Sequence, residues 1–217
     1  MEQTVRARAV IFDMDGTLVD SNAVVEAIWQ AFAERFDLVV ADVLGFSHGR
    51  QTIDTVRRFA PADADHEALA AELAAIEVET PDGIVEVPGA AAFVASIPAE
   101  RTALVTSAPL LLAKTRMTEA GVPVPPVVVP AEDVARGKPD PEGYLRATEL
   151  LGLRPEDVVV FEDAPAGIES ARAAGAQVVV VGGYAGPAAP GLPGTPDFTA
   201  VRAAVEGDEI VITWDAP

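Results

Sequence analysis

The sequence contains no cysteine and only two histidines among its 217 residues. The lack of cysteine excludes disulfide bonds and thiolate-ligated metal sites, and two histidines argue against a histidine-rich zinc site. Oxygen atoms are therefore the expected ligands for a metal ion. Oxygen ligands favour magnesium or calcium.

Long apolar runs are also missing. No stretch is long enough to cross a bilayer, and residues 1–6 lack the basic and apolar regions of a secretory signal and lead directly into a strand. Because 50% of the residues are hydrophobic, the chain can still form one large core, or a core with a small module. We expect a cytoplasmic protein without a membrane partner.

Positive charge is scarce, because 15 lysine and arginine residues stand against 34 aspartate and glutamate residues, for a formal net charge of -19. Such a surface repels nucleic acids and anionic membranes, so neither is an expected partner. A small phosphorylated substrate is still compatible with this charge. Salt screens the repulsion over roughly 10 Å, and a local cation reverses it.

The most informative stretch is residues 10–18, where an apolar run ends in Asp13 and Asp15. The β-branched members of the run indicate a buried strand. Residues two apart on a strand share a face, so the two carboxylates converge if the extended geometry continues, and Gly16 then permits a sharp turn. Open α/β sheets bind ligands at the carboxyl ends of parallel strands. A chance Asp-x-Asp run in a surface loop is the alternative.

After this strand the sequence predicts helices without an intervening strand, and from residue 88 a regular alternation of strands and helices. The first group of helices is expected at 21–36 (with Ser21 as N-cap), at 52–59 after a turn at 45–49, and at 65–79. The later strands are expected at 102–106, 127–129, 158–161 and 178–181, and the helices that precede them at 89–97, 110–120, 140–152 and 166–174.

This pattern predicts an α/β fold, with a doubly wound parallel sheet and a helical insertion after the first strand. Residues 182–196 are rich in Gly, Pro and Ala and are expected to form a loop. Residues 210–214 are expected to form a short edge strand.

Three further polar signals stand at the carboxyl ends of expected strands. Thr106-Ser107 offers hydroxyls and free N–H groups to an anion, with a simple helix cap as the alternative. Lys138 is one of only two lysines and lies in a loop bracketed by Gly and Pro, where a solvated surface lysine is the alternative. Glu162-Asp163 ends a buried strand and requires a cation or N–H donors nearby, unless it belongs to a solvated loop.

Together these signals occupy neighbouring strand ends of one sheet. Asp13, Asp15 and Asp163 can chelate a magnesium ion, while Thr106 and Lys138 can hold a phosphoryl group against it. A carboxylate can attack phosphorus to give an aspartyl-phosphate, which replaces one difficult displacement by two easier ones. Because phosphate monoesters hydrolyse very slowly without a catalyst, neutralising charge in the transition state matters most.

The four signals resemble the motifs of the haloacid dehalogenase superfamily of phosphotransferases, and the likeness covers nearly the whole chain. Residues 13–21 are similar to the first motif, Thr106 to the second, Lys138 to the third and residues 162–167 to the fourth. The resemblance implies Asp13 as the nucleophile. It also implies that Asp15 acts as general acid and then as general base, and that Thr106, Ser107 and Lys138 bind the substrate. The implied magnesium ligands are Asp13, the backbone carbonyl of Asp15 and Asp163, with Glu162 in support.

The helical insertion indicates which subgroup of this superfamily the chain resembles. Residues 46–54, 57–61 and 85–90 resemble, more loosely, the glycerol-phosphate and 2-deoxyglucose-6-phosphate phosphatases. The resemblance implies that His48 and Arg50 face the active site when the insertion closes; exposed polar side chains at an ordinary helix start are the alternative. The implied domains are a core at 1–17 and 84–217 and an α-helical cap at 18–83.

We therefore expect a monomeric, magnesium-dependent phosphatase that hydrolyses small sugar or polyol phosphates through an aspartyl-phosphate. A β-phosphoglucomutase-like enzyme shares the core motifs, and differs in whether water or a sugar hydroxyl attacks the aspartyl-phosphate. A 2-haloacid dehalogenase does not need the acid and base Asp15, and a phosphonatase needs a cap lysine, whereas Lys114 and Lys138 both lie outside the cap. A non-catalytic phospholigand-binding protein would lack a motif residue, and none is missing.

Overall fold

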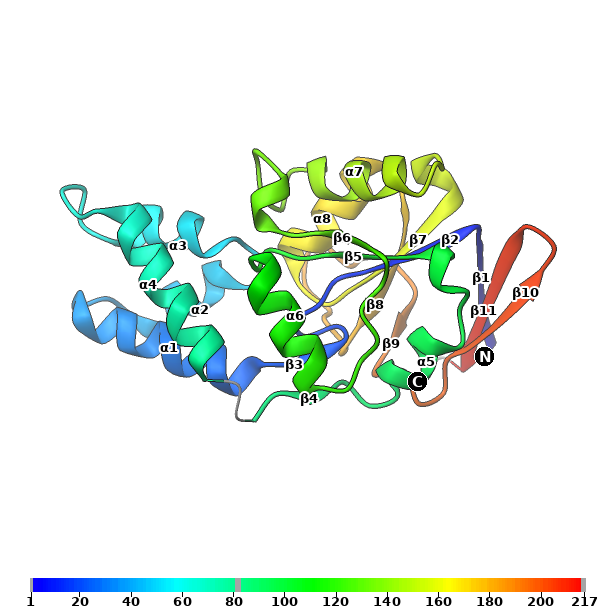
Figure 1. The fold of residues 1–217 in the computed structure, drawn as a ribbon, viewed down its shortest axis with the longest axis horizontal. Helices are drawn as coiled ribbons and strands as arrows, with labels where there is room; N and C mark the ends of the chain where they lie inside the picture. The colour runs from blue at the N-terminus through cyan, green and yellow to red at the C-terminus, as the bar shows by residue number, and fades with distance from the viewer. Residues whose placement is uncertain (1, 81–82, 216–217) are drawn as a thin grey trace.

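The computed structural model describes residues 2–80 and 83–215. Its centre is a sheet of six parallel strands in the order β6-β5-β2-β7-β8-β9 (Figure 1). The strands are β2 (Ala9–Phe12), β5 (Thr102–Val105), β6 (Val127–Val129), β7 (Val158–Glu162), β8 (Gln177–Val181) and β9 (Gly194–Thr195). The chain places β5 and β6 on one side of β2 and the later strands on the other. Open sheets bind ligands beside such a reversal of strand order.

Side chains alternate along β2, so its apolar residues contribute to both faces of the sheet. Val10 and Phe12 join one core cluster with helices α5 (Ala90–Ala95) and α6 (Leu110–Glu119). Ala9 and Ile11 join a second cluster with α7 (Glu142–Leu150) and α8 (Pro165–Ala174). Helices therefore cover both faces of the sheet (Figure 1), and the predicted doubly wound α/β fold is confirmed.

In the described part of the insertion after β2 there are four helices, where the sequence predicted three. They are α1 (Asn22–Arg35), α2 (Val40–Ser47), α3 (Thr52–Phe59) and α4 (His66–Glu79), and we call them the helical insert. The prediction of a turn from residue 45 is wrong, because α2 continues to Ser47. This helix contains β-branched residues and Gly45, which are weak helix formers, so packing of its buried Val43 stabilises it rather than local propensity.

The chain enters and leaves the helical insert through two short strands that pair with each other. These are β3 (Val19–Asp20) and β4 (Val85–Glu86), which run antiparallel. The N–H of Val87 also donates to the carbonyl of Leu18 over 3.0 Å. The expected domain boundaries at 17/18 and 83/84 fall beside this pair and stay a prediction, and residues 81 and 82 of the expected cap lie outside the described residues.

A second sheet, antiparallel and three-stranded, lies at the end of the molecule away from the helical insert (Figure 1). Its strands are β1 (Glu2–Ala7), β10 (Arg202–Glu206) and β11 (Glu209–Asp215), in the order β1-β11-β10. The predicted strand at 210–214 is present as β11, but its predicted edge position is wrong, since β11 pairs on both sides. Its neighbour β10 is mostly exposed, so its sequence shows no alternation that would reveal a strand.

The remaining regular elements are short. Among the described residues, three 3-10 helices cover Ala99–Arg101, Ala131–Asp133 and Pro155–Asp157. The expected loop at 182–196 contains only the two-residue β9 near its end. None of the helices in the described part of the chain has the length and apolar character that crossing a bilayer requires.

Candidate active site

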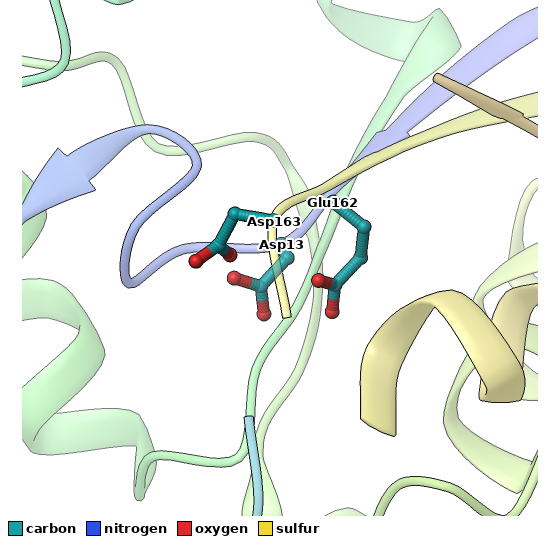
Figure 2. A group of neighbouring side chains, drawn as sticks. All are labelled: Asp13, Glu162 and Asp163. Atoms are coloured by element: carbon teal, nitrogen blue, oxygen red, sulfur yellow. The ribbon is translucent and has the colours of Figure 1, made fainter. Parts of the chain in front are cut away.

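Three carboxylates meet where β2 and β7 end. Glu162 is the last residue of β7, Asp163 follows it, and Asp13 follows β2 directly. Figure 2 shows the three side chains turned toward one another. One oxygen from each lies within 4.8 Å of the others. The parallel pairing of β2 with β7 brings residues far apart in sequence to one edge of the sheet.

Two glycines make room for these carboxylates. Gly16 has φ +85, a left-handed backbone conformation that residues with a side chain rarely adopt, and a Cβ there would overlap the carboxylate of Asp163. Gly167, in the first turn of α8, lies so close to Glu162 that a Cβ would overlap its carboxylate as well. The turn predicted at Gly16 is present, and it packs against the site.

Lys138 is buried and contacts two of the three carboxylates. Its ammonium group donates to Asp13 Oδ1 over 2.5 Å and to Glu162 Oε1 over 2.8 Å, and its side chain is 5% exposed. Burial alone would lower the pKa of Lys138, but the carboxylates of Asp13 and Glu162 raise it well above the ordinary value. The lysine is therefore a fixed positive charge beside Asp13.

Tyr144 is a site residue that the sequence analysis did not identify. It is fully buried in α7, and its hydroxyl donates to Glu162 Oε1 over 3.1 Å. The backbone N–H of Ala164 donates to Glu162 Oε2 over 2.8 Å. Burial and the adjacent Glu162 raise the pKa of Tyr144 well above its usual value, so it remains a donor. Glu162 is thus held by three donors at the base of the site.

The group of three carboxylates carries more negative charge than the protein compensates. Burial, with Glu162 adding and Lys138 opposing, raises the pKa of Asp13 to about 7. Burial and the neighbouring Glu162 and Asp13 raise the pKa of Asp163 well above its ordinary value, although Thr17 donates to its Oδ1 over 3.0 Å. Three acids facing one ammonium group fit a divalent cation with oxygen ligands.

The side chain of Asp15 lies outside this group and has partners of its own. Its Oδ1 accepts hydrogen bonds from Ser21 Oγ over 2.6 Å and from Arg116 Nη1 over 2.8 Å. Ser21 occupies the N-cap position of α1, as predicted, but makes no side-chain bond to the helix N–H groups. A magnesium contact through the backbone carbonyl of Asp15 stays a prediction.

Arg116 and Glu77 are two further residues that sequence reasoning missed. Arg116 Nη2 donates to Glu77 Oε2 over 2.5 Å, and both side chains are buried. Burial raises the pKa of Glu77, with Arg116 opposing the shift. A signal was present, since Glu77 continues the buried stripe of Leu69 and Leu73 at four-residue spacing on α4. A charged residue in such a stripe indicates a buried partner.

A cavity of about 80 Å³ beside these groups is lined by residues of both the core and the helical insert. Ser107 Oγ donates to the carbonyl of Gly49 over 2.8 Å, and Gln51 Nε2 to that of Ala131 over 3.1 Å, so the insert is hydrogen-bonded to the core on this side. Thr106 Oγ1 accepts from the N–H of Ala108 over 3.0 Å. The lining includes the predicted residues Asp13, Asp15, Thr106, Ser107, Asp163, His48 and Arg50.

The two predicted residues of the insert therefore face the same space as the predicted core residues. His48 is exposed, whereas the guanidinium of Arg50 lies 4.5 Å from the ring centre of Phe46, a distance typical of cation–π contact. Lys138 contacts the cavity residue Asp13, and Glu162 contacts Lys138, but neither of the two lines the cavity itself. The individual roles of these side chains stay predictions.

Comparison with known proteins places the fold and the site in a family context. Residues 7–175 match the family of haloacid dehalogenase-like hydrolases. Hexitol phosphatase A of Escherichia coli (strain K12) is 44% identical over 183 residues, which cover 81% of this chain and 83% of that protein. Glycerol-1-phosphate phosphohydrolase 2 of Saccharomyces cerevisiae is 35% identical over 187 residues, covering 81% and 75%. A solved β-phosphoglucomutase of Clostridium difficile has the same fold, with a TM-score of 0.77 and 20% identity over 88% of this chain and 91% of that one.

Proposed function

Because the chain belongs to the haloacid dehalogenase-like hydrolase family, we propose that it is a magnesium-dependent phosphatase that hydrolyses small sugar or polyol phosphates through an aspartyl-phosphate. The observation that carries the proposal is the buried group of Asp13, Glu162 and Asp163 with Lys138 against it. Relatives named hexitol phosphatase and glycerol-1-phosphate phosphohydrolase support the substrate class. The cytoplasmic location and monomeric state expected from the sequence are part of the proposal.

Asp13 is the nucleophile in this mechanism. One of its oxygens forms a bond to phosphorus while the ester P–O bond breaks, and the leaving oxygen keeps the bonding electron pair. Lys138 holds Asp13 Oδ1, which orients the carboxylate and neutralises part of the charge beside it. The hydroxyls of Thr106 and Ser107 line the cavity and supply donors for the phosphoryl oxygens.

Asp15 transfers protons in both halves of the reaction. Its carboxyl group gives a proton to the leaving oxygen, and its carboxylate then takes a proton from the water that attacks the aspartyl-phosphate. The helical insert covers the cavity and restricts the entry of bulk water. His48 and Arg50 of the insert contact the sugar or polyol part of the substrate.

Asp13 and Asp163, with the backbone carbonyl of Asp15 and support from Glu162, would hold the magnesium ion. A bound Mg²⁺ would neutralise charge on the transferring phosphoryl group and allow Asp13 to approach it. The donor set fits this ion because it consists of oxygen atoms and carries an excess of buried negative charge.

A panel of sugar and polyol phosphates, assayed for free phosphate with and without Mg²⁺, tests the proposal. We expect phosphate release that requires Mg²⁺, and loss of turnover in Asp13→Asn with an unchanged circular-dichroism spectrum, because the substitution is nearly isosteric. Glucose 1-phosphate should be included and its products identified, since isomerised sugar phosphate without phosphate release would indicate a mutase. A folded, Mg²⁺-loaded protein that is inert on the whole panel would contradict both activities.

A further inference from the structure

Arg116 joins the helical insert to the catalytic edge of the core. It lies on α6 of the core, 3% exposed, and its two terminal nitrogens contact different acids. Nη1 donates to Asp15 Oδ1, and Nη2 donates to Glu77 on α4 of the insert. All three residues line the cavity. One guanidinium group therefore contacts both the proposed proton donor and the element that covers it.

We propose that Arg116 is a positioning residue, which Glu77 holds in place and which orients Asp15 for proton transfer to the leaving group. This inference rests on the proposed function and adds a role for residues outside the four motifs. Full proton transfer then requires the insert to lie against the core, because Glu77 reaches Arg116 only from α4.

The geometry at Asp15 explains how positioning works. Ser21 and Arg116 both donate to Oδ1, so this oxygen is fixed by two bonds from different elements. Both of these bonds go to Oδ1, so the proposed proton transfer uses the other oxygen, Oδ2. When the ester P–O bond breaks, the leaving oxygen keeps the electron pair and takes this proton. Asp15 becomes a carboxylate, which Arg116 stabilises, and Asp13 becomes the aspartyl-phosphate.

Stability alone is a poor explanation for this arrangement. A buried ion pair is often no more stabilising than apolar residues of similar volume. Arg116 also keeps one donor unused, since its buried Nε has no hydrogen-bond partner among the described residues. Buried donors without partners oppose folding, and native proteins contain few of them.

The dependence of rate on the leaving group distinguishes positioning from a structural role. An alkoxide such as that of glycerol phosphate needs a proton as it departs, whereas p-nitrophenolate is stable without one. The quantity to compare is kcat/KM, which covers the steps through formation of the aspartyl-phosphate and excludes its hydrolysis. We expect Arg116→Met to lower kcat/KM for glycerol phosphate by about 30- to 100-fold and for p-nitrophenyl phosphate by less than about 3-fold.

Glu77→Gln supplies a second and milder variant that keeps the shape of the side chain. It should shift the ratio of the two kcat/KM values in the same direction, by about 3- to 10-fold, and should add nothing in the Arg116→Met background. Arg35→Met is the matched control. It removes an exposed ion pair with Glu72 between two helices of the insert, and should leave the ratio unchanged.

Two failures can be told apart. A wild-type protein that releases phosphate from no member of the sugar and polyol phosphate panel contradicts the proposed function itself, and any polyol phosphate that it does hydrolyse can take the place of glycerol phosphate in the comparison. An active wild type in which Arg116→Met and Glu77→Gln lower kcat/KM equally for both substrates overturns the positioning role alone. If Arg116→Met does not fold, as judged by circular dichroism, Glu77→Gln decides by the same ratio.

Discussion

Tyr144→Phe removes a single oxygen atom from the hydrogen-bond network beneath Asp13, and so tests how much that network stabilises the protein. The substitution removes the donor to Glu162 and leaves every carbon atom of a fully buried side chain in place. Lys138 and the N–H of Ala164 remain bonded to the carboxylate. A hydrogen bond to a charged group contributes about 1.5–3 kcal/mol to stability. In a domain of this size each kcal/mol corresponds to about 2–4 °C, so Tm should fall by about 3–12 °C.

The assay is thermal unfolding of metal-free protein followed by circular dichroism, because bound magnesium would stabilise the site in both variants. Tyr184→Phe is the matched control. It makes the same chemical change at the only other tyrosine, whose hydroxyl forms no hydrogen bond with any described residue. Tyr184→Phe should leave Tm within about 2 °C, because the half-buried ring keeps its packing and no hydrogen bond to a described residue is lost. Equal Tm values for Tyr144→Phe and wild type would refute the assigned contribution of the hydroxyl.

Two further predictions concern the carboxylates. Gly167→Ala should abolish most of the activity and lower the free energy of unfolding by about 3–5 kcal/mol, because its Cβ displaces Glu162 from Lys138. Urea titration measures the stability and the phosphatase assay the activity. Gly45→Ala is the control for loss of a helical glycine, since a Cβ at Gly45 in α2 meets no atom within 4 Å. The second prediction is a pH dependence. The pKa of Asp13 rises on folding from 3.8 to about 7, so its contribution to stability is present below the unfolded value and is lost as pH rises through about 7. The increase in Tm on adding Mg²⁺, measured by thermal melts, should therefore grow from pH 5 to pH 8, and an increase that is equal at both pH values would contradict it.

The sequence predicted the parts of the site that follow strands. Asp13, Thr106 and Glu162-Asp163 each come at the end of an apolar run, and parallel strands bring such ends to one edge of a sheet. The predicted order of elements was therefore sufficient to place these residues together. The resemblance to the haloacid dehalogenase superfamily, carried by the same residues, is confirmed by the family match.

Residues that reach the site from helices were not predictable in the same way. Tyr144 and Arg116 lie on apolar faces of α7 and α6, where their positions fit ordinary core packing. Which strand end each helix covers depends on how the helix crosses the sheet in three dimensions. This crossing cannot be read from a single sequence. Helix α2 and strand β10 were missed for a related reason, since tertiary contacts stabilise them against weak local propensity or an exposed pattern.

The pairing of β3 with β4 has a consequence for how such an enzyme can diversify. Both ends of the helical insert are fastened to the same short ladder, Val19 opposite Glu86 and Asp20 opposite Val85. A foreign segment whose termini lie equally close could replace residues between these strands while the strand-end carboxylates kept their places. Because Glu77 on α4 of the insert contacts Arg116, such a replacement would also have to supply a partner for this buried guanidinium group.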